Sequence, residues 1–242
     1  SRLKTKWVAH PLQFFDSIDS TNIRAKLEAE QGAESGLLVV SDMQSAGRGR
    51  RGRGWESPAG TNIYYTLMLK PDFSSDCAPM LTLVMALAVA KGIRQTLRRD
   101  SEEAAAKVGI KWPNDIVVDG KKVCGILTEM SMEQGYIQHI VIGVGINVRK
   151  QEFPEEIRDR AAAIDEQCGF RISRSQLIAD IMEAFEEDYE IFLRTHDLKG
   201  LRASYAELLV NQDREVCVLD PKGEYRGIAR GINDQGELLV ER

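Results

Sequence analysis

The segment from about Pro79 to Arg99 constrains the fold more than any other part of this sequence, because it predicts a helix that is apolar nearly all the way round. Its longest apolar stretch, Ala78 to Ala90, is too short to span a bilayer. We therefore expect a buried helix at the centre of the molecule. A chain of 242 residues can bury such a core in one large domain, or in one large and one small domain.

Strands and helices interleave along the first 208 residues. Asp119-Gly120 is a hairpin signal, so some neighbouring strands are joined directly rather than through helices. This pattern predicts an α+β fold, with a mixed β-sheet flanked by helices. Strands are predicted over residues 12–18, 37–42, 62–69, 108–112, 115–118, 121–130 and 136–148, and helices over 22–31, 79–99 and 177–193.

The pattern changes after residue 208. Short strands are predicted at 214–220, 224–232 and 237–242, separated by Pro-Lys-Gly (221–223) and Asp-Gln-Gly (234–236) turns. We therefore predict a large domain over residues 1–208 and a small β domain over residues 209–242. Three strands alone would leave an unpaired edge and an open core, so we expect the small domain to be short of its full set of strands.

Composition narrows the class of protein. The formal net charge is −5, so no basic field covers the whole molecule and we expect no nucleic-acid partner. The first residues are basic and then mixed, without the cleavage site of a signal peptide. Four scattered cysteines include no CxxC pair. These features predict a reduced, cytoplasmic protein without a membrane anchor.

A glycine- and arginine-rich loop, GRGRRGRGW, covers residues 47–55 between two predicted strands. It contains G-x-G-x-x-G, but a dinucleotide site needs a helix at the third glycine, and here WESPAGTN leads into a strand. A Walker A loop fails too, because Arg53 stands where lysine is required. Four arginines on a compliant backbone suit a carboxylate or a phosphate. A solvated basic loop or an RNA-binding tract is the alternative, which a single copy in an acidic protein disfavours.

Four other short segments carry side chains that suit a nucleotide or an acid. In one of them Asn114 offers an amide donor and acceptor for adenine, and Asp115 offers oxygen to Mg²⁺. Taken singly, each segment has a plain structural explanation as a turn, a solvated lysine, a glycine-kinked strand or a helix N-cap. The segments are KWPND (111–115), KK (121–122), GVGIN (143–147) and STN (20–22).

In combination these motifs are specific. STN, Q-x-A-GRGRRGR-x-W, KWPND, KK-x-x-GIL-x-E and G-x-GIN, in this order and spacing, resemble the biotin–protein ligase family over roughly the first two-thirds of the chain. The resemblance implies a mixed α/β ligase domain related to class II aminoacyl-tRNA synthetases, followed by an SH3-like domain. Many bacterial members begin with a winged helix-turn-helix. We expect none in this sequence, whose opening SRLKTKW resembles the end of the connector that follows such a domain.

The resemblance also implies a role for each matching residue. The ureido ring of biotin would be bound by Ser20, Thr21, Asn22 and Gln44. The biotin-binding loop would comprise Gly47, Arg48, Gly49 and Arg50, with Trp55 as an aromatic side chain near the active site. Lys122 would contact the biotin carboxylate and the adenylate phosphate. The ATP side would comprise Lys111, Asn114, Asp115, Gly145 and Asn147.

The implied reaction joins biotin to AMP, releases pyrophosphate, and then transfers biotin to a lysine of a biotin carboxyl carrier protein or domain. Two anions must meet in the first step, so Arg48, Arg50, Lys111 and Lys122 would neutralise and align them, together with Mg²⁺ held by Asp115. The expected ligands are therefore ATP, Mg²⁺ and biotin, and a homodimer is a further expectation. Two alternatives stay open: a lipoate ligase of the same fold, and a non-catalytic regulator that binds biotin.

Overall fold

A seven-stranded sheet lies at the centre of the computed structural model, which describes residues 2–219 and 223–242. Its strand order is β1-β2-β3-β7-β6-β5-β4. β1 and β2 pair in parallel and every other neighbouring pair is antiparallel, so the predicted mixed sheet is confirmed. The strands are β1 (Leu12–Phe15), β2 (Leu38–Ser41), β3 (Ile63–Leu69), β4 (Val108–Lys111), β5 (Asp115–Val118), β6 (Lys121–Glu133) and β7 (Tyr136–Ile146).

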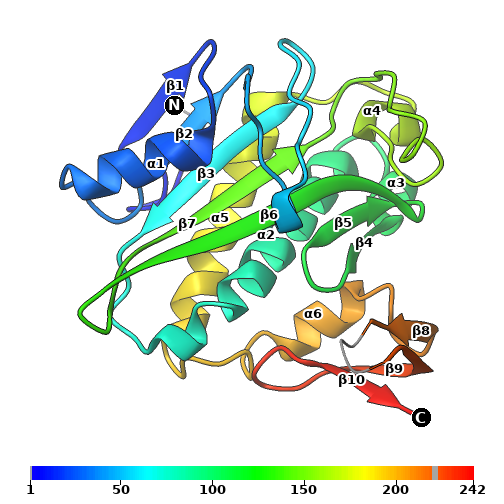
Figure 1. The fold of residues 1–242 in the computed structure, drawn as a ribbon. Helices are drawn as coiled ribbons and strands as arrows, with labels where there is room; N and C mark the ends of the chain where they lie inside the picture. The colour runs from blue at the N-terminus through cyan, green and yellow to red at the C-terminus, as the bar shows by residue number, and fades with distance from the viewer. Residues whose placement is uncertain (1, 220–222) are drawn as a thin grey trace.

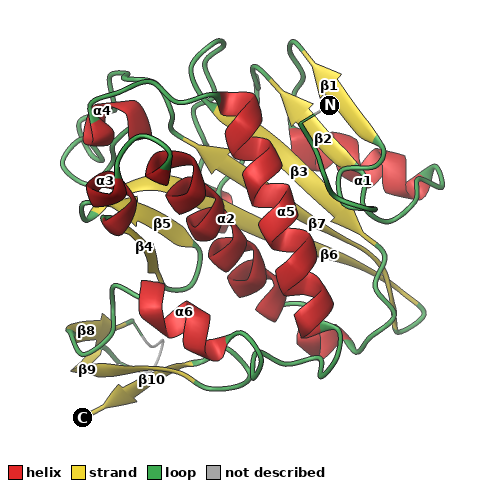
Figure 2. Cartoon of the chain, turned by 180° about the vertical axis from the view of Figure 1, so that it is seen from behind, coloured by secondary structure: helices red, strands yellow, loops and turns green. Residues whose placement is uncertain are grey.

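Two long helices cover one face of this sheet, as Figure 2 shows: α2 (Met80–Arg98) and α5 (Arg174–Phe192). α2 is the apolar helix that the sequence predicts, and most of its residues are buried. Residues 75–98 are long and apolar enough to cross a membrane by composition, but most of this stretch is packed inside the molecule. α5 approaches α2 closely at Gly92, where an added Cβ would lie 2.5 Å from Ile181. α2 is therefore the buried core helix, and it packs against α5 on this face of the sheet.

The opposite face is only partly covered. α1 (Thr21–Glu30) packs there through Ala25 and Ala29 on Val39, Met68 and Val141. The sequence also predicts a second short helix before Val210, and α6 (Arg202–Leu208) confirms it. Short elements that the sequence did not predict complete the fold, because runs of three to five residues are too brief to carry a clear period. They are α3 (Glu102–Ala106), α4 (Ile164–Cys168) and the 3₁₀ turns η1 (Arg50–Gly52) and η2 (Ser75–Cys77).

The small C-terminal sheet has the strand order β10-β9-β8, all antiparallel, as expected. Its strands are β8 (Glu215–Val218), β9 (Tyr225–Ile232) and β10 (Leu238–Glu241). It meets the main sheet at Trp112, whose indole N–H donates to the Gly236 carbonyl at 3.0 Å. Most of the turn predicted at 221–223 lies outside the described residues. The division into domains at residues 208 and 209 remains our proposal.

Candidate active site

The register of β3, β7 and β6 builds a floor almost without side chains on the face that α1 leaves open. Side chains alternate along β7, so Ile142 and Val144 are buried in the core while Gly143 and Gly145 take the opposite face. Gly145 lies opposite Gly125 of β6, and Gly143 lies opposite Thr66 of β3. The glycines of the predicted GVGIN motif are therefore the site floor.

A polar network stands at the α1 end of this floor. Gln44 Oε1 accepts hydrogen bonds from the Thr21 amide at 2.9 Å and from its hydroxyl at 3.0 Å. Thr66 Oγ1 lies 2.9 Å from Thr21 Oγ1 and 2.6 Å from Asn22 Oδ1. An added Cβ on Gly143 would lie only 2.1 Å from Asn22 Oδ1, so the strand needs glycine there. The structure thus joins three of the four predicted ring-binding residues through their side chains.

Ser20, the fourth predicted ring-binding residue, occupies the N-cap position of α1. Its exposed fraction is 2 %, and its backbone is extended, as N-cap residues usually are. Its hydroxyl makes no capping hydrogen bond, however. Ser20 is therefore the N-cap residue by position, as the alternative interpretation holds, but its hydroxyl does not cap the helix.

The arginine loop folds back on itself in front of the sheet (Figure 1). The Gly49 amide donates to the Arg53 carbonyl at 2.8 Å, and Arg48 forms a bridge with Gly54. Gly47 is required for this closure, because an added Cβ would lie 2.2 Å from the Trp55 carbonyl oxygen. Arg51 adopts the left-handed conformation, with φ of 57°. The loop is therefore a small hairpin.

Trp55 lies flat on the glycine floor. Its Nε1 would be 2.4 Å from a Cβ on Gly145, and its Cζ3 would be 2.9 Å from a Cβ on Gly125. Lys122 Nζ lies 5.6 Å from the indole centroid, within the range of a cation–π contact. The indole N–H is buried and has no hydrogen-bond partner among the described residues. Trp55 therefore brings an unused donor to the point where the loop meets the sheet.

Cationic side chains gather at the other end of the floor. Lys122 Nζ lies 2.7 Å from Asp115 Oδ1. Arg50 Nη1 donates to Asn114 Oδ1 at 2.5 Å, and Asn114 Nδ2 donates to the Ile126 carbonyl at 3.1 Å. The loop, the KWPND turn and β6 therefore meet here, as the sequence predicts.

Three predicted site residues are less closely joined to these groups. Lys111 is exposed at the end of β4, across from Asp115, and its side chain makes no hydrogen bond or ion pair within the described part of the chain. Asn147 is buried just after β7, where its amide donates to the Val123 carbonyl at 2.7 Å. The Arg48 side chain is exposed and makes no hydrogen bond or ion pair among the described residues, and its charge lowers the pKa of Glu129.

Sequence reasoning missed several polar residues of the site. Thr66 is a buried polar residue in an otherwise apolar strand, which is a usable signal. Ser57 accepts from Gln44 Nε2 at 3.0 Å but sits in a stretch with no period. Glu129 ends the motif KK-x-x-GIL-x-E, and its carboxylate binds both Asn22 and Lys26. Only the fold reveals the contacts of Glu129, because they join α1 to β6.

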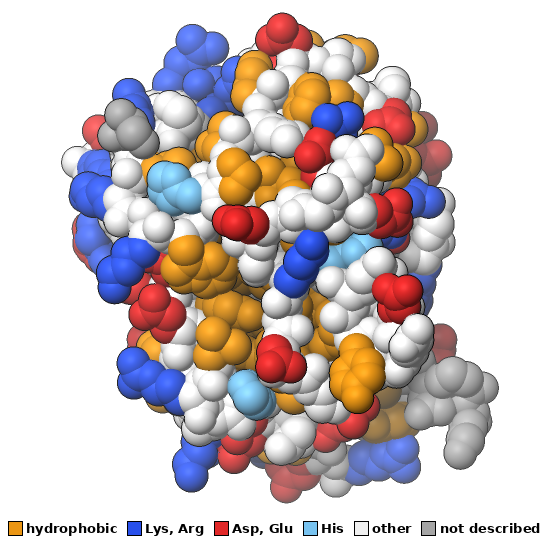
Figure 3. All heavy atoms as spheres, turned by 90° about the vertical axis from the view of Figure 1, so that its left-hand side faces the viewer, with side chains coloured by type: hydrophobic (Ala, Val, Ile, Leu, Met, Phe, Trp, Pro, Cys, Tyr) orange, Lys and Arg blue, Asp and Glu red, His pale blue; other side chains and the backbone are white. Residues whose placement is uncertain are grey.

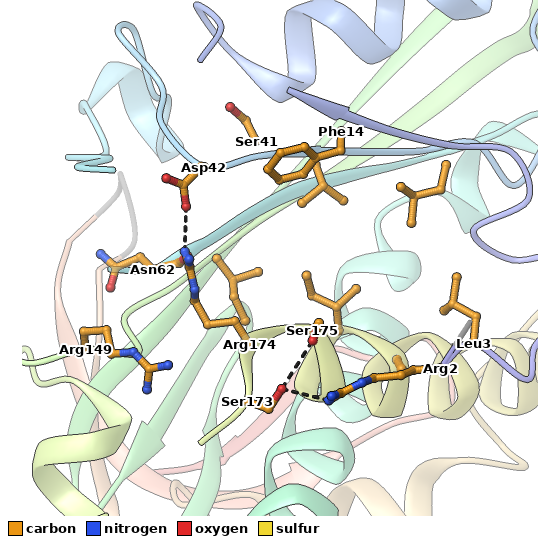
Figure 4. A pocket seen from close by; sticks show the side chains of 15 residues that line it. Arg2, Leu3, Phe14, Ser41, Asp42, Asn62, Arg149, Ser173, Arg174 and Ser175 are labelled. Carbon is orange, nitrogen blue, oxygen red and sulfur yellow. Dashed lines mark hydrogen bonds and ion pairs between the residues drawn. The ribbon is translucent and has the colours of Figure 1, made fainter. Parts of the chain in front are cut away.

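One cavity adjoins the site and another lies on the opposite face of the sheet. The first, of about 470 Å³, lies between α2, the KWPND turn and the β9–β10 turn, and Arg50 and Pro113 line it. The other, of about 640 Å³, lies between β1, β2, β3 and α5 and is lined by none of the predicted site residues. Arg174 crosses it to Asp42 at 2.8 Å, as Figure 4 shows. In the face shown in Figure 3, acidic and basic side chains are scattered among apolar ones.

Comparison with known proteins agrees with this geometry. Residues 14–147 match the biotin/lipoate A/B protein ligase family, so the fold and the site define a protein ligase of this family. The chain is 37 % identical to the bifunctional ligase/repressor BirA of Bacillus subtilis, over 99 % of this chain and 72 % of that protein. It is 30 % identical to the biotin–[acetyl-CoA-carboxylase] ligase of Paracoccus denitrificans, over 92 % of this chain and 90 % of that protein.

A solved structure shares the whole architecture. The biotin protein ligase from Aquifex aeolicus, in complex with biotin and ATP, superposes with a TM-score of 0.79 at 28 % identity. The match covers 95 % of this chain and 90 % of that one. Within the family, the chain therefore belongs to the biotin–protein ligases, and the expected fold and type of enzyme are confirmed.

Proposed function

We propose that this protein activates biotin with ATP to form biotinyl-5′-AMP and pyrophosphate, and then transfers biotin to a lysine of an acceptor protein. One observation carries the proposal: a single glycine floor connects a neutral polar pocket at one end with cationic side chains at the other. The network of Thr21, Asn22 and Gln44 suits an uncharged ring that both donates and accepts hydrogen bonds. Lys122 and Arg50 suit a carboxylate and phosphates.

The polar end would bind the ureido ring. Ser20 keeps a hydroxyl without a capping bond, and Thr21 and Gln44 hold each other in place. The chain of biotin would then run past Gly143 and Gly145, beside the Asn22 and Trp55 side chains that lie against them. Trp55 would lie along one side of the bound biotin chain, and the carboxylate of biotin would reach Lys122.

At the cationic end, the carboxylate oxygen of biotin would attack the α-phosphorus of ATP and pyrophosphate would leave. Both reactants are anions, and Arg48, Arg50, Lys111 and Lys122 would lower their repulsion and align them. Arg50 would also hold the arginine loop against the KWPND turn, because it donates a hydrogen bond to Asn114. A closed loop would keep water from the reactive mixed anhydride until the acceptor lysine attacks it and AMP leaves.

The residues present fit Mg²⁺ only as an ion that arrives with the phosphates. Among the described residues, no three His, Cys, Asp or Glu side chains gather into a metal site. Mg²⁺ needs only one or two carboxylates when phosphates supply other ligands. Asp115 has one oxygen on Lys122 and a second oxygen left for the ion, which would supply charge neutralisation at the phosphates.

The acceptor would be a biotin carboxyl carrier protein or domain, as the names of the Paracoccus denitrificans and Mycobacterium tuberculosis relatives suggest. Those names favour biotin over lipoate as the acid. We place the enzyme in the cytoplasm. A homodimer is supported by β6, whose edge beyond Gly125 pairs with no strand in the described structure and carries the exposed Met130 and Met132.

The test is pyrophosphate release from ATP, measured with biotin, with lipoate and with no acid. Release with biotin alone establishes the activation step. Release with lipoate instead would make the protein a lipoate-type ligase. Binding of biotin by calorimetry without any release would make it a non-catalytic regulator. Addition of a carrier domain, followed by mass spectrometry of the modified lysine, tests the transfer step.

A further inference from the structure

Glu129 of β6 links the polar pocket to a charge on α1. Its two carboxylate oxygens have one partner each: Oε2 accepts from Asn22 Nδ2 at 2.8 Å, and Oε1 accepts from Lys26 Nζ at 2.9 Å. The side chains of Glu129 and Lys26 are only partly exposed, at 26 % and 31 %. Residues 107 positions apart in the sequence, Asn22 and Glu129, are thus joined directly at the site.

The bond to Glu129 fixes the orientation of the Asn22 amide. Asn22 is buried, and its Oδ1 already faces the Thr66 hydroxyl at 2.6 Å. With an acceptor on the Nδ2 side and a donor on the Oδ1 side, only one of the two flipped amide orientations satisfies both neighbours. Gly143 lies directly beneath and leaves no room for a shift toward the strand. Asn22 therefore presents one defined pattern of donor and acceptor to whatever enters the pocket.

The charge on Glu129 is stabilised where it lies. Burial alone would raise the pKa of Glu129, but the hydrogen bonds from Lys26 and Asn22 and the charges of Lys26 and Arg48 outweigh burial and lower it. The carboxylate is therefore ionised at neutral pH and accepts at both oxygens. Arg48 belongs to the arginine loop, so the charge of that loop acts on this carboxylate as well.

We propose that Glu129 is a positioning residue for the biotin ring, which orients the Asn22 amide, and that Lys26 holds the Glu129 carboxylate in place. This inference rests on the proposed function, because biotin is the ligand for which the Asn22 amide is oriented. Neither residue touches the reacting carboxylate or phosphate, so the effect falls on biotin binding and not on ATP binding. A merely structural ion pair at this level of exposure would leave biotin affinity unchanged.

The test uses Glu129→Gln, Lys26→Met and the double variant in pyrophosphate-release assays and biotin calorimetry. The amide introduced by Glu129→Gln has one oxygen and one NH₂ group, so it can accept from only one of the two neighbours. Whichever neighbour faces the NH₂ group, either the Lys26 ammonium or the Asn22 amide, loses its acceptor. We expect KM for biotin to rise about tenfold or more, KM for ATP to stay within about twofold, and the melting temperature to stay unchanged. The double variant removes the ammonium and lets the Gln oxygen face Asn22, so it should recover much of the loss.

Glu28→Gln is the matched control, because Glu28 pairs with Arg24 on the same helix and belongs to no part of the network. It should keep the parental KM for biotin. The proposal is overturned if Glu129→Gln keeps that KM, if both KM values rise together, or if the double variant is as impaired as the single one. A parent protein that neither binds biotin nor releases pyrophosphate would overturn the proposed function and this inference with it.

Discussion

Arg50 of the arginine loop reaches Asn114 of the KWPND turn, with Nη1 2.5 Å from Oδ1. The two residues are 64 positions apart in sequence, so this hydrogen bond joins the arginine loop to the KWPND turn. Asn114 is itself anchored, because its Nδ2 donates to the Ile126 carbonyl. We expect this contact to act as a latch that holds the loop over the site.

Removal of this latch should release the adenylate early. We predict that Arg50→Gly still forms biotinyl-AMP, because Lys122 and Arg48 remain, but no longer keeps the intermediate under the loop. Escaped anhydride reacts with any nearby amine, so the variant should biotinylate bystander proteins. The measurement is biotin incorporation into serum albumin, together with the rate at which biotinyl-AMP leaves the enzyme. Equal retention by variant and parent would rule the latch out.

Arg51→Gly provides the control for that experiment. Arg51 is exposed on the same loop, and its φ of 57° is a conformation that glycine adopts without strain. It forms no hydrogen bond or ion pair within residues 2–219 and 223–242. The variant removes one arginine charge and adds one glycine, as Arg50→Gly does, and should retain the adenylate as the parent does.

Gly145, which lies under the Trp55 indole, should tolerate no side chain. In Gly145→Ala the new Cβ would lie 2.4 Å from Trp55 Nε1 and 2.5 Å from its Cε2, so the indole must move. We predict a loss of roughly tenfold or more in biotin-dependent pyrophosphate release, because the loop moves with it. Gly54→Ala, with its nearest neighbouring atom at 4.0 Å, should retain most of the activity. An active Gly145→Ala enzyme would show that Trp55 has no such role.

Lys122 should matter to chemistry far more than to stability. We predict that Lys122→Gln lowers the rate of pyrophosphate release by roughly 10²- to 10³-fold, because a charge at the reacting anions is lost. Its pair with Asp115 is partly exposed, so the melting temperature should hardly change. Lys121→Gln replaces the exposed neighbour on β6 and should remain active. Comparable activity in both variants would place the reacting groups elsewhere.

Much of this site could be predicted from the sequence because its motifs lie at strand ends and turns, where residue types indicate a binding role without knowledge of the fold. The apolar period of α2 predicted the core helix. The glycines of GVGIN suggested a strand where backbones approach closely, but the groups that lie against Gly143 and Gly145 are the side chains of Asn22 and Trp55. The family resemblance assigned Arg50 and Asn114 to one active site, but the sequence did not predict the hydrogen bond between them.

The rest depended on register, which no single segment encodes. Glu129 faces α1 because β6 and β7 pair with Glu129 opposite Val141, and a slip of one residue would turn it to the core side. The network through Thr66 likewise depends on β3 lying beside β7 and not beside β6. The sequence could therefore predict the motifs of the site, but it could not predict which polar neighbours support them.

A last prediction concerns the N-terminal segment, which one carboxylate holds against α5. Glu186 accepts from the Lys6 amide at 2.8 Å and from the Trp7 and Val8 amides at 3.0 Å. Burial alone would raise the pKa of Glu186, but these three bonds outweigh burial and lower it. The folded state therefore favours the ionised form more than the unfolded state does. Its contribution to stability is present above the unfolded pKa, about 4.3, and is lost as pH falls through the lower folded pKa.

We predict that Glu186→Gln lowers the free energy of unfolding at pH 7 by about 1–3 kcal/mol, because the amide cannot accept from all three N–H groups. The difference from the parent should shrink as the pH is lowered through the acidic range, since the parent then loses the same charge. Urea unfolding at several pH values measures both effects. Glu190→Gln, an exposed site on the same helix, should change the free energy by less than about 0.5 kcal/mol. A pH-independent difference would mean that Glu186 acts by packing and not through its charge.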